Sequence, residues 1–557
     1  MNNIDQAVRE FLEGVVAVRG FPPVHMGETI DWAADPFAHP SWRFRFHSLT
    51  WLVPFFECAE AQERVRDILL QWFKGNPPSN PPSDFSWSDH STALRAEVYA
   101  TAAQKFPDDW IIEALERHGT LLSDPEFYEG EGNHALDQSI ALHKVGAVLG
   151  REDWLKLAEE RMNSLAIESI DDQGVTNEGS VHYQLYNWQR YGAAIRQVQA
   201  TGREIPAGLA RQGSMASMLA HATRPDGCYE TIGDTFLVRA FPIPGTPAEY
   251  AATQGKRGRP PGRRVAVFDA GYVFGRSGWG ERRAFEEETF YSLRFGPGEV
   301  HKFHRHADHT SITWHPRGVP VLVDTGYDGY APTSYRFRYS KAPEGHNVVV
   351  VRGGKLVPTR ETSLLLVSVR DRDREESYHV FGGPYVGVHR HRRVLFVHEP
   401  PVVVVRDDLV SKEVRTYDQL WHVAPDLDVT VDRNRARITG KGLTVHMLQV
   451  CAGTSMSVVK GHIDPYQGWV SWNEGERQPS PTIVATEEAA TTTFLTVFAA
   501  AARVNAVLMP GGLLIDVDHE RLKVAVDDPM RVSERWLADP TDARRNPTEV
   551  GHGTPPT

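Results

Sequence analysis

The chain has 557 residues, of which 41% are hydrophobic and 24% charged, and this composition excludes a disordered, collagen-like or coiled-coil protein. Its length exceeds what one hydrophobic core serves, about 250–300 residues, and predicts two large domains or one large domain with smaller ones. The formal net charge of −12 disfavours a general nucleic-acid binder, because phosphate binding requires a basic surface. A local basic cleft could still hold a polyanionic substrate.

Neither targeting nor disulfide signals stand out. Residues 1–21 lack a basic segment followed by an apolar one, and the sequence has no apolar run of about 18 residues. We therefore expect a cytoplasmic protein without a membrane span, or a secreted or periplasmic one if the sequence is a mature form. The widely spaced Cys58, Cys228 and Cys451 predict buried thiols rather than disulfides or a thiolate zinc site.

The first part of the chain, residues 1–254, has apolar residues at helical spacing between loops rich in Pro, Gly, Asn and Asp. The predicted helices cover residues 57–73, 91–105, 137–149, 153–169, 180–201 and 207–222. Consecutive helix pairs joined by loops indicate an α-toroid or a large bundle.

Residues 255–264 contain Gly, Pro and five basic residues, and we predict a linker there. Short segments rich in β-branched and aromatic residues follow, which predicts an antiparallel β-sandwich over residues 265–530. The predicted strands cover residues 265–273, 289–294, 311–314, 319–323, 347–351, 363–369, 393–397, 402–405, 443–450 and 492–499. Residues 531–557 are polar and rich in proline, and we predict a frayed tail.

One cluster of histidines and carboxylates falls in the β-rich part. His304 and His306 are two residues apart, so on a strand they would share one face. Asp324 follows the next apolar segment, and His346 precedes a third. Two histidines and a carboxylate from neighbouring strands suit a divalent first-row metal, most often zinc. The alternative is a set of surface or hydrogen-bonded histidines that do not converge.

Two further clusters lie in the helical part. Asn133 and His134 enter an apolar helix, where Asn133 could cap the helix or, with His134, bind an anion. A second helix start combines polar and aromatic side chains. They are Glu178, Ser180, His182, Tyr183, Tyr186 and Trp188. This set is typical of a sugar-binding rim, although such aromatic residues could also only pack against neighbouring helices.

The three clusters, in this order, resemble those of the heparinase II/III-like polysaccharide lyases over roughly residues 90–430. The matching segments are Asn133-His134, Glu178-Gly-Ser180-Val-His-Tyr183, Pro225-Asp-Gly227, Ile232-Gly-Asp234, His304-Arg-His306-Ala-Asp308, Asp324-Thr-Gly326 and His346-Asn347. The sequence departs from the family pattern at Gln184 and Arg305, where relatives often have His and Gly. The resemblance implies an N-terminal incomplete (α/α) toroid followed by a C-terminal antiparallel β-sandwich.

The resemblance also implies β-elimination at the 4-O-glycosidic bond of a uronic acid, which leaves a 4,5-unsaturated end. The implied substrates are glycosaminoglycans, namely heparan sulfate, hyaluronan or chondroitin, and alginate. Asn133 and His134 would bind the uronate carboxylate, and Tyr183 and His304 would serve as acid and base. The implied metal, zinc or manganese, would be structural.

The metal ligands implied by the resemblance are His306, Asp324 and His346. For substrate binding we expect Glu178, His182 and Arg338. Lys302, Arg305 and Arg336 could attract the acidic glycan as well. A further tyrosine between residues 327 and 339 is expected in the site, but the sequence does not tell which one. The oligomeric state and the choice between endolytic and exolytic action also stay open.

Three alternatives compete with the lyase. Two histidines and a carboxylate also describe a non-heme iron oxygenase. A glycoside hydrolase on an (α/α) toroid would need two carboxylates, for which Glu178 with Asp137 or Asp234 are the candidates. The third alternative is a carbohydrate-binding protein without activity.

Overall fold

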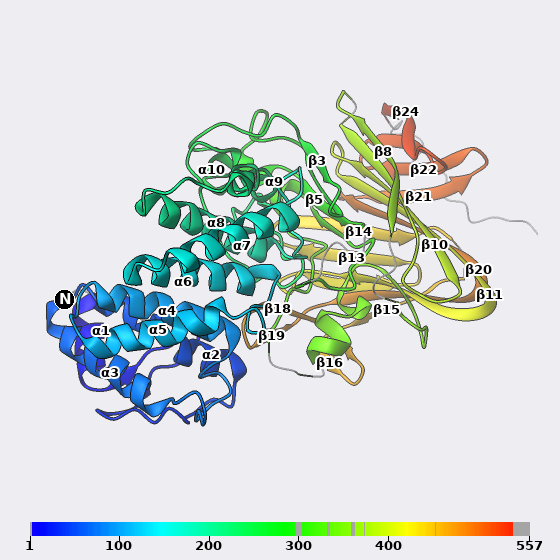
Figure 1. The fold of residues 1–557 in the computed structure, drawn as a ribbon. Coiled ribbons are helices and arrows are strands. Elements are labelled where there is room, and N and C mark those ends of the chain that lie inside the picture. Colours follow the sequence, from blue (N-terminus) through cyan, green and yellow to red (C-terminus); the bar gives the residue numbers. More distant parts are fainter. Residues whose placement is uncertain are drawn as a thin grey trace, which may run out of the picture.

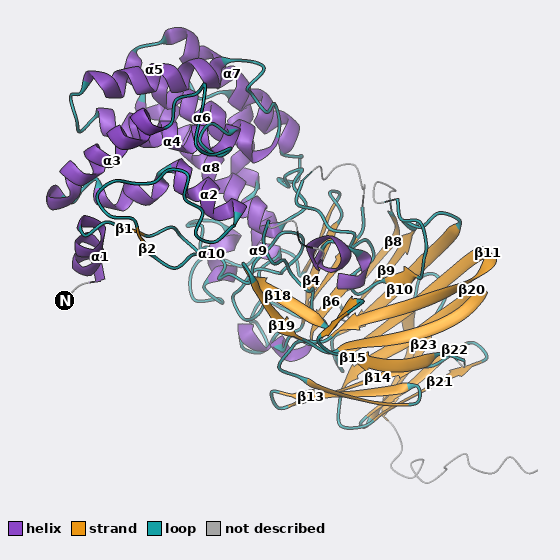
Figure 2. Ribbon diagram, turned by 90° about the horizontal axis from the view of Figure 1, so that it is seen from below, coloured by secondary structure: helices purple, strands orange, loops and turns teal. Residues whose placement is uncertain are grey.

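The computed structural model describes residues 3–296, 303–330, 333, 335–357, 362–372, 374–451 and 453–537. A helical half is followed by a half made of antiparallel sheets (Figure 1). The predicted order of the two folds is therefore confirmed. In Figure 2 the helices gather at one end of the molecule and the strands at the other.

The helical half is built from helices that follow one another closely along the chain. They are α1 (Asn3–Leu12), α2 (Pro40–Ser48), α3 (Gln62–Gly75), α4 (Asp89–Ala103), α5 (Asp109–Ser123), α6 (Gly132–Leu149), α7 (Glu152–Ser169), α8 (Val181–Ala200), α9 (Ala216–His221) and α10 (Pro247–Ala252). Helices predicted at residues 91–105, 153–169 and 180–201 are present as α4, α7 and α8. Residues 207–222 form a 3₁₀ segment and α9 instead of one helix.

The sequence does not predict α2, although this helix borders the functional cavity described below. Trp42, Phe44 and Phe46 alternate with polar residues, which is the spacing of a strand. In the helix, Trp42 and Phe46 are four residues apart and both are buried, so they anchor α2 in the core. Pro40 occupies the first turn, where a missing N–H costs nothing.

The β half contains one large sheet with strand order β12-β13-β14-β20-β11-β10-β9-β8. The bounds of its strands are β7 (Val349–Val351), β8 (Ser363–Arg370), β9 (Glu375–Phe381), β10 (Val388–Val397), β11 (Val402–His422), β12 (Asp428–Asp432), β13 (Arg435–Gly440), β14 (Leu443–Gln449), β15 (Ser455–Val459) and β20 (Thr482–Ala500). Two four-stranded sheets accompany it. They consist of β3 (Val265–Phe268), β4 (Tyr272–Arg276), β5 (Phe290–Arg294) and β6 (Ile312–His315), and of β21 (Val504–Met509), β22 (Gly512–Val517), β23 (Glu520–Ala525) and β24 (Arg531–Leu537).

The large sheet is covered on both faces, which explains its uninterrupted valine run. Successive side chains of a strand point to opposite faces. Val403 and Val405 belong to the core shared with β3–β6, whereas Val402 and Val404 belong to the core shared with β21–β24. The β half is therefore a three-layered sandwich.

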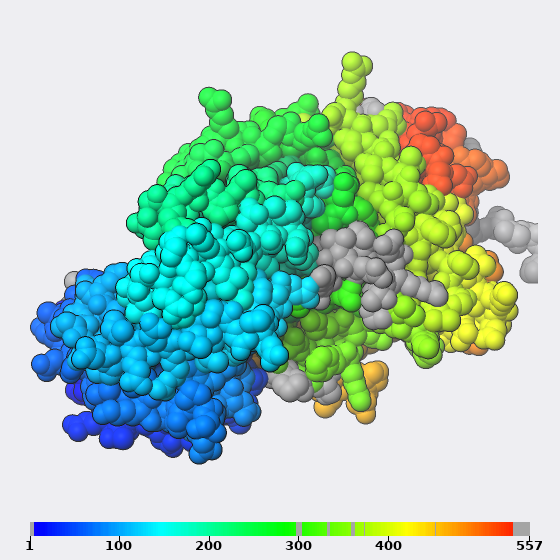
Figure 3. Space-filling view, viewed as in Figure 1, coloured from blue at the N-terminus to red at the C-terminus, as the bar shows by residue number. Residues whose placement is uncertain are grey.

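The sheet β3–β6 also joins the two halves. Val273 of β4 faces the large sheet, while its neighbours Tyr272 and Phe274 pack in a core with Leu219 of α9. A continuous apolar layer thus runs from the helices into the sandwich. In the space-filling view the cyan and green middle of the chain lies between the blue helices and the yellow-to-red strands (Figure 3).

Some strand predictions are wrong in detail. Residues 531–537 form β24, paired with β23, rather than a frayed tail, because Val532 is buried in the core of that sheet. Residues 538–557 lie outside the described part. Within residues 319–323, only Leu322 is paired, through isolated bridges to Trp314 and Val423. Among the described residues, no helix has both the length and the apolar composition needed to cross a bilayer.

A buried ion pair ties the large sheet to the loops that precede β6 and β7. Arg392 of β10 binds both carboxylate oxygens of Asp407 at 2.7 Å, and both side chains are fully buried. The guanidinium also donates to the carbonyls of Thr310 and Asn347 at 2.7 and 2.6 Å. Arg392 therefore holds the backbone beside the histidine cluster of this half.

We predict that Arg392→Met lowers the free energy of unfolding by about 3–5 kcal/mol, because Asp407 would stay buried without its counterion. Arg393→Met is the matched control, since this neighbour points to the other face and pairs with the partly exposed Asp408 and Asp528. That control should cost only about 0–1 kcal/mol. Equilibrium denaturation measures both, and equal losses would contradict the role given to Arg392.

Candidate active site

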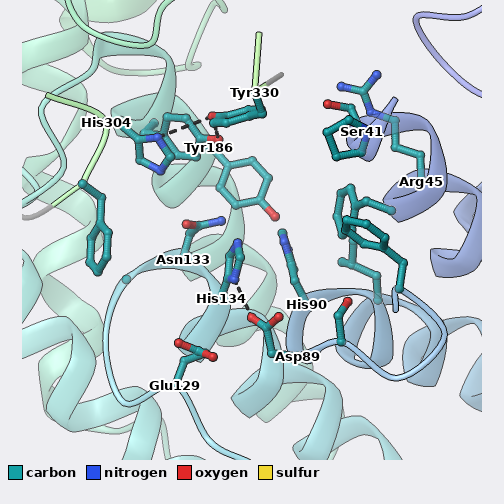
Figure 4. Close-up of a pocket in the computed structure, with 18 of the residues that line it drawn as sticks. Ser41, Arg45, Asp89, His90, Glu129, Asn133, His134, Tyr186, His304 and Tyr330 are labelled. Carbon is teal, nitrogen blue, oxygen red and sulfur yellow. Dashed lines mark hydrogen bonds and ion pairs between the residues drawn. The ribbon is translucent and has the colours of Figure 1, made fainter. Parts of the chain in front are cut away.

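A cavity of about 630 Å³ lies at the boundary between the two halves. Helices α2, α4, α6 and α8 and the loops before α4 and α6 supply most of its wall, and loops of the β half supply the rest. Its lining residues are Pro40, Ser41, Phe44, Arg45, Phe85, Ser88, Asp89, His90, Leu94, Glu129, Glu131, Gly132, Asn133, His134, His182, Tyr183, Tyr186, Phe303, His304 and Tyr330. Figure 4 shows His304 and Tyr330 on one side, His134 and His90 side by side with Asp89, and Arg45 on the opposite wall.

The segment Glu178–Tyr183 positions a tyrosine by capping a helix. The Ser180 hydroxyl accepts a hydrogen bond from the backbone N–H of Tyr183 at 3.4 Å and so caps the first turn of α8. The same hydroxyl donates to the carbonyl of Asp234 at 2.9 Å. This places Tyr183 at the start of α8, beside the segment that carries Asp234.

Tyr183 of the helical half meets His304 of the β half in this cavity. Their rings are stacked with centroids 3.5 Å apart and planes 7° apart. The Tyr183 hydroxyl is hydrogen-bonded to the Tyr330 hydroxyl, which lies 3.4 Å from His304 Nδ1. Burial, and then the neighbouring Tyr330, raise the pKa of Tyr183 well above its usual value, so the phenol keeps its proton at neutral pH. Of Tyr327, Tyr330, Tyr335 and Tyr339, Tyr330 is the one that lines the cavity.

The predicted strand at His304 and His306 is wrong, because the residues around them form a loop. His304 has φ +56°, a left-handed conformation that no regular strand accommodates. Two backbone hydrogen bonds fix this loop to the helical half: Gly179 N–H donates to Phe303 O at 2.9 Å, and Asp234 N–H donates to His304 O at 3.1 Å. The two halves are therefore joined at the cavity itself.

Asp234 links the two histidines. Its carboxylate accepts from His304 Nδ1 at 3.0 Å and from His306 Nε2 at 2.8 Å, and Lys341 Nζ lies 3.7 Å away. Burial would raise the pKa of Asp234, but the hydrogen bonds from both histidines hold it well below its usual range. Asp234 is therefore a permanent anion that orients both rings.

The predicted metal ligands do converge. His306, Asp324 and His346 each offer one ligand atom, and these atoms lie within 4.8 Å of one another. All three side chains are buried. Among the described residues, His306 Nδ1 and His346 Nε2 have no hydrogen-bond partner, while the other nitrogen of each ring is bound to Asp234 or Asp324. Two unpartnered buried ring nitrogens beside a carboxylate fit a divalent metal with oriented ligands.

The protonation of these two histidines differs. Burial lowers the pKa of His306 despite Asp234, which favours the neutral ring that a metal requires. Burial would also lower the pKa of His346, but Asp324 raises it above its usual value. A metal would have to displace that proton, so its affinity should fall at low pH.

Asn133 and His134 line the cavity at the start of α6. His134 Nδ1 binds Asp89 at 2.5 Å, which leaves Nε2 as the donor for a ligand. Burial would lower the pKa of His134, but the hydrogen bond and charge of Asp89 raise it above its usual value. The His134 ring packs against the His90 ring, with centroids 4.1 Å apart and planes inclined by 32°. Asp89 and His90 are not among the residues predicted from the sequence, although an adjacent acid and histidine at a helix start were a signal.

The three predicted substrate-binding residues lie in different places. His182 lines the cavity, and burial lowers its pKa to about 4. Glu178 is buried behind His304, with its Oε2 3.3 Å from His304 Nε2 and its Oε1 bound to Asn187 at 2.7 Å. Arg338 is exposed and outside the cavity lining, while Lys302 lies outside the described residues. Arg45, which the sequence analysis does not single out, does line the cavity.

Two family descriptions match most of the chain. Residues 2–241 match the description "Heparinase II/III N-terminus", and residues 263–508 match "Heparinase II/III-like, C-terminal". The chain belongs to the heparinase II/III-like family of polysaccharide lyases. A comparison with curated protein sequences gives no match.

Solved structures share the fold over nearly the whole chain. Heparan sulfate lyase HepC from Pedobacter heparinus is 17% identical, with a TM-score of 0.68 over 94% of this chain and 89% of that one. A structure of heparinase III is 15% identical, with a TM-score of 0.79 over 94% and 90%. Chondroitin AC lyase from Streptomyces coelicolor A3 is 11% identical, with a TM-score of 0.50 over 94% and 84%. At these identities the likeness establishes the fold.

We predict that Gly233→Ala displaces the His304 loop and abolishes activity. Gly233 has φ +63°, and an added Cβ would lie 2.0 Å from Gly179 O and 2.7 Å from His304 O. The melting temperature should fall as well. Gly213→Ala is the matched control, because its Cβ would meet nothing within 4 Å. Similar melting temperatures for the two variants would contradict the close packing at Gly233.

We predict that Asp89→Asn moves the alkaline limb of the kcat/KM profile to lower pH. The raised pKa keeps His134 cationic over a wider range, and removing the carboxylate lets its proton leave earlier. The Asp89–His134 pair also stabilises the folded protein. This stabilisation is complete below the pKa that histidine has in the unfolded chain, and it is lost as the pH rises through the higher pKa of His134 in the folded protein.

The matched control for Asp89→Asn is Asp153→Asn. Asp153 pairs with Arg151 on the surface, so this change should leave the profile in place. An alkaline limb that stays fixed in Asp89→Asn would show that His134 does not carry the titration.

Proposed function

We propose that this cavity cleaves uronate-containing glycans, of the glycosaminoglycan or alginate type, by β-elimination. The observation that carries the proposal is the stacking of the Tyr183 ring on the His304 ring, across the boundary of the two halves and in the same cavity as Asn133 and His134. The site thus combines a protonated phenol, an oriented imidazole and donors for a carboxylate.

The first requirement of the reaction is to neutralise the uronate carboxylate, which makes the C5 proton more acidic. Asn133 and the Nε2 of His134 can donate to it from the start of α6. Fixed donors aimed at developing charge give the largest electrostatic gain in such sites. The raised pKa of His134 helps, because an imidazolium binds a carboxylate more strongly than a neutral ring does.

Proton transfer then falls to His304 and Tyr183. Asp234 accepts from His304 Nδ1, and Glu178 Oε2 lies 3.3 Å from Nε2, the nitrogen that takes the C5 proton. The two carboxylates thus stabilise the imidazolium that forms. Tyr183 donates its phenolic proton to O4 of the leaving sugar. Tyr330 is hydrogen-bonded to the Tyr183 hydroxyl and lies 3.4 Å from His304 Nδ1, so it helps to position both groups. After elimination, His304 Nε2 releases its proton to water and the Tyr183 phenolate takes one from water, which restores both groups.

The charges around the cavity favour a substrate with few sulfo groups. Among the described lining residues, Arg45 is the one lysine or arginine, against the carboxylates of Asp89, Glu129 and Glu131. A carboxylate can be bound by Asn133 and His134, but a densely sulfated chain would meet like charges. Hyaluronan and unsulfated chondroitin are therefore the first substrates to test.

We propose a structural role for a divalent metal, zinc or manganese, held by His306, Asp324 and His346. The support is the convergence of the three ligand atoms and the two unpartnered ring nitrogens. Bound there, the ion would supply a fixed point for the His306 ring. That ring in turn shares Asp234 with His304, so the ion would help to orient the catalytic imidazole without touching the sugar.

The geometry disfavours two of the alternatives. His306, Asp324 and His346 have exposed fractions of 4, 2 and 0%, whereas an oxygenase needs open positions for dioxygen and substrate. For a hydrolase, the pairs predicted from the sequence are not accessible: Glu178 and Asp234 are buried behind His304, and Asp137 is buried in an ion pair with Arg190.

We predict that Tyr183→Phe and His304→Ala each lower kcat by at least about 100-fold, because each removes a group that moves a proton. The assay incubates hyaluronan, unsulfated chondroitin, heparan sulfate and alginate separately and follows the ultraviolet absorbance of the unsaturated uronate. Tyr250→Phe is the control, since its hydroxyl binds Trp279 O outside the cavity.

The outcomes separate the alternatives. New reducing ends without ultraviolet absorbance would replace the lyase by a hydrolase, and dioxygen uptake would replace it by an oxygenase. Binding of a glycan without any product would leave a carbohydrate-binding protein. Full activity in a correctly folded Tyr183→Phe variant would remove Tyr183 from the mechanism.

We predict that the purified protein holds about one divalent ion per chain, and that a chelator removes it and lowers the melting temperature. His346→Ala should lose the ion, whereas His519→Ala, at an exposed turn, should keep it. Elemental analysis and thermal unfolding measure both effects. If the purified protein contains no metal and its melting temperature is the same with and without the chelator, the proposed metal site is wrong.

A further inference from the structure

An ion pair spans the two halves at the wall of the cavity. Arg45 of α2 donates through one terminal nitrogen to Glu474 Oε2 at 2.9 Å and through the other to the carbonyl of Arg19 at 2.8 Å. Arg45 belongs to the helical half and Glu474 to the β half. The side chains are 28% and 16% exposed, so the pair is partly withdrawn from water.

Glu474 sits on an anchored hairpin. It lies in the turn between β18 (Trp469–Asn473) and β19 (Glu476–Pro479), which Figures 1 and 2 place at the boundary of the halves. Gly475 N–H donates to Asp328 O at 2.9 Å, and Arg477 binds the Asp328 carboxylate at 2.7 Å. Asp328 is two residues before Tyr330, so the hairpin is tied to the loop that lines the cavity.

The helical half holds the same hairpin from the other side. Leu237 N–H donates to Trp472 O at 2.9 Å. With Arg45 on Glu474, the hairpin therefore has two attachments to the helical half. An isolated surface ion pair would be too weak to block the passage of a glycan. The Arg45–Glu474 pair is stronger because backbone hydrogen bonds hold the hairpin that carries Glu474.

Arg45 also separates two cavities. It lines the active-site cavity and a second, apolar one of about 830 Å³ formed by residues near the N-terminus, among them Val18, Trp51 and Phe55. The active-site cavity, at about 630 Å³, lies within the size range of small-molecule pockets. A glycan that ran from one cavity into the other would have to displace the Arg45 side chain, which Glu474 holds in place.

We propose that the Arg45–Glu474 pair closes one end of the active-site cavity and makes the enzyme exolytic, so that it binds the end of a uronate glycan and releases fragments of one short length. This inference rests on the proposed lyase function. In this proposal Arg45 and Glu474 determine which bond of the glycan is cleaved. Oligosaccharides should then be better substrates than long polymers, because they have more chain ends per unit mass.

The wild-type protein gives the first test. A long hyaluronan or unsulfated chondroitin and its size-defined oligosaccharides are digested in parallel, with ultraviolet absorbance, viscosity and product size followed together. An exolytic enzyme gives a single short product from the first minutes while viscosity falls slowly per bond cleaved. An early ladder of many lengths would overturn the proposal. If no glycan gives unsaturated product, the lyase function itself fails, which is a different result.

Variants then test the ion pair. In Glu474→Ala and in Arg45→Ala the early products should include longer fragments, and the viscosity lost per bond cleaved should rise several-fold. Glu476→Ala is the matched control, because Glu476 lies on the same hairpin and its side chain binds Asn473 instead of the helical half. Melting temperatures show that each variant is folded. A folded Glu474→Ala variant with the wild-type product pattern would show that the pair is not the barrier.

Discussion

The site depends on a buried carboxylate that one half of the molecule supplies and the other half neutralises. Asp234 comes from the helical half, whereas His304 and His306 come from a loop of the β half. Burying a carboxylate is costly unless hydrogen bonds and opposite charges compensate it. Both histidines and Lys341 provide that compensation. If the two halves slid against each other here, the Asp234 carboxylate would lose these partners while it remained buried. The position of the His304 ring is thus set by electrostatics as much as by packing.

The backbone reinforces this constraint. The loop around His304 is bound to Gly179 and Asp234 by main-chain hydrogen bonds, and Gly233 allows the approach. On the far side of the cavity, the hairpin with Glu474 reaches α2. Between these attachments, the sheet β3–β6 shares a core with α9. The cavity is therefore framed by several independent contacts between the halves, which suits a reaction that needs its acid and base at fixed positions.

The sequence predicts the fold class well, because the period of the apolar residues changes from helical to strand-like near residue 260. It predicts less where the local pattern and the tertiary environment disagree. Trp42, Phe44 and Phe46 have strand spacing but lie on α2, and His304 and His306 have strand spacing but lie in a loop. The apolar run Val402–Val405 predicts a buried strand, but it does not predict how many sheets pack against that strand.

Within the site, the motifs point to Tyr183, His304, Asn133 and His134, and they also include Asp234, but they do not tell which residues pair with one another. Asp234 lies 70 residues from His304, Asp89 lies 45 residues from His134, and Tyr330 lies 147 residues from Tyr183. Such pairings arise only when distant segments meet in the folded chain. One sequence without its relatives holds no local signal for them.

The order of the halves along the chain has a consequence for biosynthesis. The helical half leaves the ribosome first, carrying Asp234 and the start of α8 before either histidine has been made. Until the segment around His304 arrives, Asp234 has to remain hydrated, so the region that surrounds it cannot close. The cavity is complete only after the segment that carries His304 and Tyr330 has docked on the helical half.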